Sequence, residues 1–197
     1  MKLKKRLITL SFVTLLFPGS LYAADLGIGV NIDAFSDDGI GFGVLLPMRF
    51  GNLTIEPEGS FSDFSSDGAT IAGNESTERT SFSVGTGIYV RKNLVLFTES
   101  YFGVRLGYRS DDETTTSVNG ADVFTYDSTG HALFIAPTVG IQYFFSERFS
   151  LGCDVGLMYS DGKNKYSQSQ NGVAFGYSSG DYSEWSTTSR VVVRAFF

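Results

Sequence analysis

Cysteine, long apolar runs and basic charge are all scarce in this sequence. Cys153 is the only cysteine among 197 residues, which excludes an internal disulfide. Beyond the first 23 residues, no stretch is long and apolar enough for a membrane helix, which needs about 20 residues. The chain therefore has neither a covalent cross-link nor a later helical anchor to account for its fold.

The N-terminal segment is basic first, then apolar, then rich in small residues. Four basic residues within the first six precede an apolar stretch over residues 7–17, and Ala23 ends a plausible cleavage site. This order is typical of a secretory signal peptide, and the apolar stretch is too short to span a membrane. We therefore expect residues 1–23 to be removed on export and residues 24–197 to form one domain.

Removal of the signal peptide makes the remaining chain strongly acidic. The mature part would carry 11 Lys and Arg residues against 21 Asp and Glu residues, a net charge of −10. A nucleic-acid partner would require a basic face, so none is expected.

Beyond Asp25 the sequence alternates in polarity with a period of two. In the first segment Leu26, Ile28 and Val30 share one face, while Gly27 and Gly29 share the other. Eight such segments of about ten residues are separated by turn-rich polar stretches, as is typical of β-strands. They cover residues 26–35, 40–50, 53–62, 82–91, 94–109, 132–145, 149–160 and 185–197.

The charges inside these segments all lie opposite the apolar face. They are Asp33, Arg49, Glu56, Glu58, Arg91, Glu99, Arg105, Arg109, Asp154, Arg190 and Arg194. The alternation alone does not say which face of each strand lies inside the fold. In a soluble β-sandwich the charged face would point outward to water. Five acids against six arginines nearly neutralise one another, however, as a closed interior needs because unpaired buried charge is costly.

Glycines collect on the same polar face, as expected where backbones crowd inside an eight-stranded barrel. We therefore predict an all-β fold, an eight-stranded antiparallel up-and-down transmembrane β-barrel with an apolar exterior. Aromatic residues on the apolar face form two groups, as expected for the two interfaces of a bilayer. One group is Phe50, Tyr143, Phe145, Phe149 and Phe197; the other is Phe61, Phe82, Tyr108, Tyr159 and Trp185.

The predicted connections differ in length between the two ends of the barrel. Tight turns are expected at residues 51–52, 92–93 and 146–148; long loops are expected at residues 63–81, 110–131 and 161–184, with a brief one at 36–39. Short periplasmic turns and long extracellular loops are typical of outer-membrane barrels. Pro47, Pro57 and Pro137 lie within strands, where a closed barrel has no free edge, so we expect local bulges there.

The stretch "PTVGIQYFFSERFSLGCDVGLMY", residues 137–159, and the closing aromatic Phe197 carry a family resemblance. The mature chain resembles the small outer-membrane barrels of the OmpA/OmpX and opacity-protein type. The resemblance implies a place in the outer membrane of a Gram-negative bacterium, among lipid and lipopolysaccharide. It also implies that the barrel-assembly machinery recognises the last strand through Val191, Val193, Ala195 and Phe197. No peptidoglycan-binding domain follows the barrel, so cell-wall anchoring is not implied.

Two roles are open for the predicted barrel. An eight-stranded barrel is just wide enough for side chains to fill, so the charged residues would form a structural plug, with a narrow channel as the alternative. The four predicted loops hold fourteen acidic and three basic residues. They would bind divalent cations among lipopolysaccharide phosphates or a host ligand, as in adhesion, or serve only for solvation. "DDET" lacks the spacing of a calcium loop, and no metal site or cofactor is expected.

A lipid A-modifying enzyme is the rival class. Such enzymes need a serine that approaches a histidine oriented by an acid. His131 is the only histidine, and Leu133 stands where deacylase-type spacing would place the serine. We therefore expect no catalytic residues.

Overall fold

The fold is built from nine antiparallel strands. The computed structural model describes residues 24–36, 39–70 and 73–197; the predicted signal peptide, residues 1–23, lies outside the described residues. The strands are β1 (Ala24–Ser36), β2 (Gly39–Leu45), β3 (Met48–Phe50), β4 (Leu53–Thr70), β5 (Gly73–Val95), β6 (Thr98–Asn119), β7 (Asp122–Ser146), β8 (Phe149–Gln170) and β9 (Val173–Phe196). No helix in these described ranges is both long enough and apolar enough to cross a membrane.

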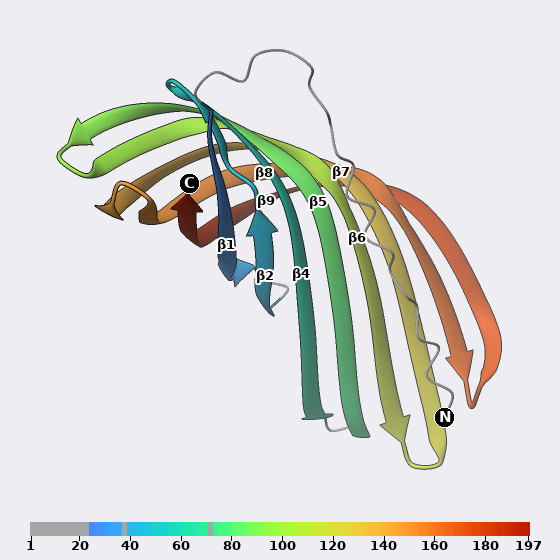
Figure 1. Cartoon of the computed structure of the whole chain (residues 1–197). Coiled ribbons are helices and arrows are strands. Elements are labelled where there is room, and N and C mark those ends of the chain that lie inside the picture. The colour runs from blue at the N-terminus through green and yellow to red at the C-terminus, as the bar shows by residue number, and fades with distance from the viewer. Residues whose placement is uncertain (1–23, 37–38, 71–72) are drawn as a thin grey trace.

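The strands close into a ring. From β4 onward each strand pairs with the next, and β1 pairs with β9 from Gly27 opposite Phe196 to Asp33 opposite Arg190. β2 and β3 lie end to end between β1 and β4, so they share one of the eight positions of the ring. The predicted eight-stranded, antiparallel, up-and-down barrel is confirmed (Figure 1).

Alternation along each strand sends apolar side chains outward and polar ones inward. On β1, Ile28 and Val30 are 48% and 52% exposed, whereas Asn31 is buried. Both predicted aromatic groups lie on the outward face, and each contains rings in contact. The ring centroids of Tyr143 and Phe145 are 5.2 Å apart in one group, and those of Tyr159 and Trp185 are 5.0 Å apart in the other. An apolar exterior with aromatic residues near both ends suits a strand barrel surrounded by hydrocarbon.

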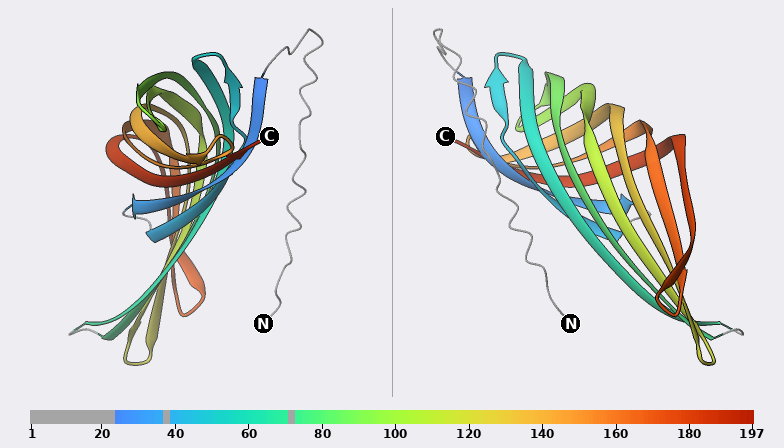
Figure 2. Two further views of the ribbon diagram at one scale, coloured as in Figure 1. Left: turned by 60° about the vertical axis from the view of Figure 1, so that its left-hand side comes forward. Right: turned by 90° about the vertical axis from the view of Figure 1, so that its right-hand side faces the viewer.

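Six strands are far longer than a membrane requires. A spanning strand needs about 9–11 residues, but β4 has 18 residues and β7 has 25. Beyond the β1–β2 hairpin, the long strands continue as a curved sheet (Figure 2). We call this part the extension; it comprises residues 63–70, 73–81, 110–119, 122–131, 161–170 and 173–184.

The extension corrects the prediction of three long loops. Cross-strand pairing continues without a break from Phe82 opposite Ser110 to Asn74 opposite Val118. Polar side chains stabilise these pairs, as where Thr77 and Thr115 share a hydrogen bond at 3.2 Å. The strands were missed because both of their faces are polar, so the sequence shows no apolar alternation there.

One tight turn was also predicted in the wrong place. Residues 92–93 lie inside β5, and the chain turns at Leu96 and Phe97 instead. A register shift between Asn93 and Val95 lets the pairing run past the predicted turn, and Phe97 adopts a positive φ of 64°. The turns at residues 51–52 and 147–148 lie where they were expected.

The three strand prolines do not cause the predicted bulges. Pro57 and Pro137 keep the register of their strands, opposite Thr86 and Val104. Pro47 interrupts the strand between β2 and β3, yet the register to both neighbours is the same before and after it. A proline removes one donor but not its acceptor, and the Pro47 carbonyl still accepts a hydrogen bond from the Gly27 amide at 2.8 Å.

Two interior glycines leave room for tyrosine rings. A Cβ atom added at Gly140 would overlap the ring of Tyr101, and one added at Gly87 would overlap the ring of Tyr89. The glycines on the polar face thus allow large side chains to cross the narrow interior.

We expect Gly140→Ala to destabilise the folded barrel by about 1–3 kcal/mol, because the added methyl group must displace Tyr101. Gly180→Ala is the matched control, since a Cβ there meets open space. The measurement is the urea midpoint at which the heat-modifiable band of the unboiled protein disappears. Equal midpoints for the two variants would show that Tyr101 is not packed as described.

Candidate functional site

The interior of the barrel is built around Arg190, whose side chain is fully buried. Its guanidinium donates to both carboxylate oxygens of Asp154, at 2.9 and 2.8 Å, and to Glu58 at 2.6 Å. Arg105 donates to the other oxygen of Glu58 at 2.9 Å. Two arginines and two acids from β4, β6, β8 and β9 therefore neutralise one another across the bore.

Two tyrosines extend this cluster. The hydroxyl of Tyr101 donates to Asp154 at 3.0 Å, and the Tyr89 hydroxyl accepts from Arg190 at 3.3 Å. The two rings meet edge to face with centroids 5.3 Å apart. The tyrosines thus fill the bore with apolar rings while their polar atoms complete the ion cluster.

A second cluster lies nearer the end of the barrel where β1 begins and β9 ends. Arg194 donates to both oxygens of Glu56, at 2.7 and 3.0 Å. Gln142 accepts from Arg194 at 3.3 Å and donates to Glu99 at 2.7 Å, so it links this pair to the next. Arg49 and Arg91 both bind Glu99, with closest distances of 2.7 and 3.2 Å; these three side chains complete the cluster.

Aromatic rings narrow the bore at that end. The Arg49 guanidinium lies over the rings of Phe144 and Phe196, at 5.2 and 4.8 Å from their centroids. The cavity beside these residues has a volume of about 10 Å³. A cavity needs roughly 10–15 Å³ to hold one water molecule, so little free space remains there.

The structure gathers the predicted charged residues but divides them between three levels. Nine of them make the contacts described above. Asp33 lines a chamber of about 90 Å³ together with Arg105, Arg109 and several serines. Arg109 also lines the extension, where it contacts Asp111 at 2.8 Å and Glu184 at 3.3 Å. That these residues act together as a structural network stays a prediction.

The prediction from the sequence assigned only charged side chains to the interior, so it missed the uncharged side chains that also lie there. Tyr89, Tyr101 and Gln142 lie on the polar face by parity, so the same alternation would have found them. Asp111 and Glu184 were missed because they lie in segments that the sequence presents as loops.

The last strand turns its predicted recognition residues outward. Val191 and Phe197 are exposed, and Val193 and Ala195 are partly exposed on the same parity. Their recognition by the assembly machinery stays a prediction.

His131 lies opposite Ser110 on the outward face, a neighbour that no sequence spacing revealed. The Ser110 hydroxyl donates to the Gly130 carbonyl at 3.4 Å, and the His131 ring faces that of Tyr108 at 6.4 Å. Over residues 24–36, 39–70 and 73–197, no group of three or more His, Cys, Asp or Glu residues is placed to hold a metal ion.

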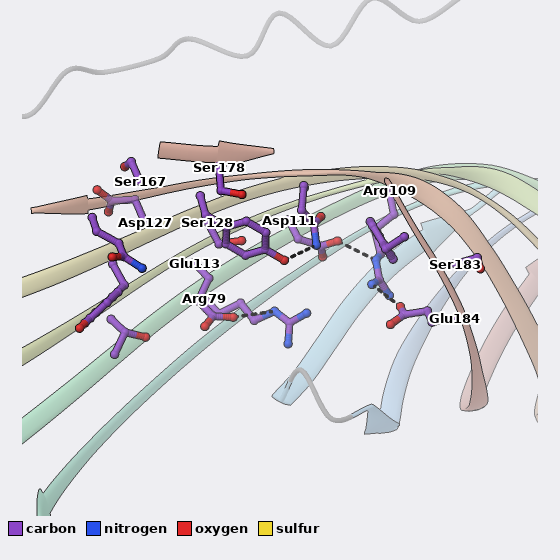
Figure 3. A pocket seen from close by; sticks show the side chains of 17 residues that line it. Arg79, Arg109, Asp111, Glu113, Asp127, Ser128, Ser167, Ser178, Ser183 and Glu184 are labelled. Atoms are coloured by element: carbon purple, nitrogen blue, oxygen red, sulfur yellow. Dashed lines mark hydrogen bonds and ion pairs between the residues drawn. The ribbon is translucent and has the colours of Figure 1, made fainter. Parts of the chain in front are cut away.

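A cavity of about 750 Å³ lies on the concave side of the extension. We call it the groove; Figure 3 shows its side chains. It is lined by Arg79, Arg109, Asp111, Glu113, Thr115, Tyr126, Asp127, Ser128, Gly130, Asn164, Tyr166, Ser167, Gln168, Ser178, Tyr182, Ser183 and Glu184, which come from β5 to β9.

The groove is polar, and both of its arginines are paired with acidic side chains. Arg109 is held between Asp111 and Glu184, and Arg79 lies 3.9 Å from Glu113 (Figure 3). Burial raises the pKa of Tyr182, and its phenol, protonated at neutral pH with or without this shift, can donate a hydrogen bond. The groove therefore offers fixed donors and acceptors side by side.

No family model and no curated protein matches the sequence. Solved structures do match. A major outer membrane protein from Thermus thermophilus is similar with a TM-score of 0.60 and 14% identity, over 89% of this chain and all of that chain. Acinetobacter baumannii CarO2 is similar with a TM-score of 0.50 and 13% identity, over 89% of this chain and all of CarO2.

Weaker matches include Ail, the attachment invasion locus protein of Yersinia pestis. Its TM-score is 0.43 and its identity 14%, over 88% of this chain and 96% of Ail. The similarity to the Thermus thermophilus protein and to CarO2 supports the predicted barrel fold. The chain has the fold of the small outer-membrane β-barrel proteins.

We expect Arg190→Gln to destabilise the barrel by about 3–5 kcal/mol, because it leaves the buried acids Asp154 and Glu58 without their main partner. Lys163→Gln is the control: Lys163 and Asp181 form an exposed pair at 3.7 Å, worth less than about 1 kcal/mol. Urea unfolding in detergent micelles measures both variants. A loss in Arg190→Gln no larger than in the control would contradict the described interior.

Proposed function

We propose that this outer-membrane barrel is a rigid support with a plugged interior, and that its extension binds a ligand at the cell surface. The groove on the extension is the observation that carries the proposal. The two parts of the chain differ in a way that supports this proposal. Paired side chains occupy the bore of the barrel, whereas the extension lines an open groove of about 750 Å³.

The plug is favoured over a narrow channel by the arrangement of the ion pairs. Arg190 and Arg194 each bind carboxylates from other strands through two or more hydrogen bonds and are buried. A passing ion would have to separate such pairs, which costs several kcal/mol in a medium of low dielectric. The pairs therefore brace the barrel wall.

The extension has the features of a binding element on a rigid scaffold. Its strands continue those of the barrel, so its side chains are held in place by the cross-strand pairing. Tyr, Ser, Asn and Gln are frequent along the groove, and residues of this kind supply adaptable hydrogen bonds and flat contact area at low entropic cost. Adhesion to a host or neighbouring surface is the role this supports.

A lipid A-modifying activity is not favoured. The Ser110 hydroxyl donates to a backbone carbonyl beside His131, which leaves it poorly placed to be activated by that histidine. We propose that the protein is not an enzyme, and mass spectra of lipid A from cells with and without it should be the same. A loss or gain of one acyl chain would contradict this.

We predict negligible conductance for the pure protein in planar lipid bilayers, because the paired side chains fill the bore. The recording is made at low and high salt, since a charged pore would carry current at both. Large and stable unit currents would contradict the plug.

Replacing residues 113–128 by Asn-Gly tests the extension. The new turn joins Asp112 and Thr129, which are directly opposed, so the shortened hairpin keeps its register. We expect adhesion of expressing bacteria to cultured epithelial cells to fall to the level of cells without the protein. The heat-modifiable band and the surface amount serve as controls, and unchanged adhesion would refute the proposed role.

A further inference from the structure

We infer that the groove binds a neutral oligosaccharide, an inference that rests on the proposed surface-binding function and names its ligand class. The first observation is the shape of the groove. β1 and β2 pair only as far as Ser36 and Gly39, whereas β5 to β9 continue beyond them, so the extension is not closed into a ring. An elongated ligand can lie along such a groove without threading through a pore.

The second observation is the balance of donors and acceptors. Sites for drug-like ligands are lined mainly by apolar side chains, but this groove presents serines, amides, carboxylates and guanidinium groups. A sugar hydroxyl both donates and accepts, so a chain of sugars matches a surface that alternates the two functions. The paired groups Arg109, Asp111 and Glu184 are held in place before any ligand arrives.

The third observation is the set of tyrosines. Tyr126, Tyr166 and Tyr182 line the groove from three neighbouring strands, β7, β8 and β9. Tyr126 and Tyr166 are 42% and 43% exposed, and Asn164 donates to the Tyr166 hydroxyl at 2.9 Å, which orients that ring. Exposed, fixed aromatic rings offer flat apolar faces, against which the C–H faces of sugar rings pack.

The charge of the groove decides against an anionic ligand. Four acidic side chains line it, Asp111, Glu113, Asp127 and Glu184, against Arg79 and Arg109. Both arginines already face carboxylates. A sulfated or phosphorylated chain would meet an excess of negative charge, whereas a neutral chain would not.

The test uses the whole mature protein in detergent and three neutral probes, maltohexaose, cellohexaose and chitohexaose. Saturation-transfer difference NMR reports which probe protons contact the protein, and titration gives the affinity. We expect at least one probe to bind, and excess dextran sulfate to leave its binding unchanged. Failure of all three at about 10 mM, or displacement by dextran sulfate, would overturn the inference.

Matched variants locate the binding. Tyr166→Ala and Tyr126→Ala should each raise the dissociation constant of the probe about fivefold, because each variant loses one aromatic contact. Tyr177→Ala is the control, because Tyr177 is a 72% exposed residue of the same extension and is not among those that line the groove. Retention of the heat-modifiable band shows that each variant is folded. Equal weakening by Tyr177→Ala would overturn the inference.

Two further competition experiments distinguish between two sources of neutral sugar chains. One uses the polysaccharide released from the lipopolysaccharide of the producing bacterium, and the other uses neutral glycans released from epithelial glycoproteins. Competition by either against the hexasaccharide supports the inference and names the source. If adhesion depends on the extension but no sugar binds or competes, the inference fails and the proposed function stands.

Discussion

The structure depends on one electrostatic constraint: the charges that the barrel encloses must find their partners inside it. The exterior is apolar, and an uncompensated charge in a closed bore would cost several kcal/mol. Arg190 and Arg194 meet this constraint through contacts at 2.6–3.0 Å with Asp154, Glu58 and Glu56. Glu58 and Glu56 lie on β4, far in the chain from Arg190 and Arg194 on β9, so these ion pairs form only when the ring has closed. Asp154 is the cross-strand neighbour of Arg190 on β8 and joins the same cluster. The interior is therefore specific to this register, because a shift of one residue would turn every charge toward lipid.

The closed ring also explains why the two ends of the molecule differ. At the end where β1 begins and β9 ends, aromatic rings and the Glu99 cluster leave little space in the bore. At the opposite end, the longer strands continue beyond the β1–β2 hairpin, and their inward face becomes the floor of the open groove. The same alternation that fills the barrel thus places polar side chains on an open surface of the extension. A rigid wall of paired strands holds that surface, in contrast to the mobile loops on which binding residues often lie.

The sequence allowed the barrel to be predicted but not the extension. Within the barrel, one face is apolar and the other polar, so period two is visible and the interior charges can be sorted by parity. Glu113 and Thr115 point to the opposite face from their sequence neighbours, but those neighbours are polar too. The sequence therefore shows no alternation in polarity that would predict this strand. Asn-Gly at residues 171–172 was a usable signal, since both residues adopt positive φ at the tip of the β8–β9 hairpin. The pairing of Arg190 with Glu58, 132 residues apart, had no local signal at all.

Cys153 allows the central claim, that the apolar face lies outside, to be tested without any substitution. It is exposed on the outward parity of β8, between the inward residues Gly152 and Asp154, and away from both aromatic groups. A nitroxide attached to this cysteine in a reconstituted bilayer reports its surroundings by electron paramagnetic resonance. The structure predicts strong collisional broadening by oxygen, which dissolves in hydrocarbon, and weak broadening by a water-soluble nickel chelate. Strong broadening by the nickel chelate would contradict it.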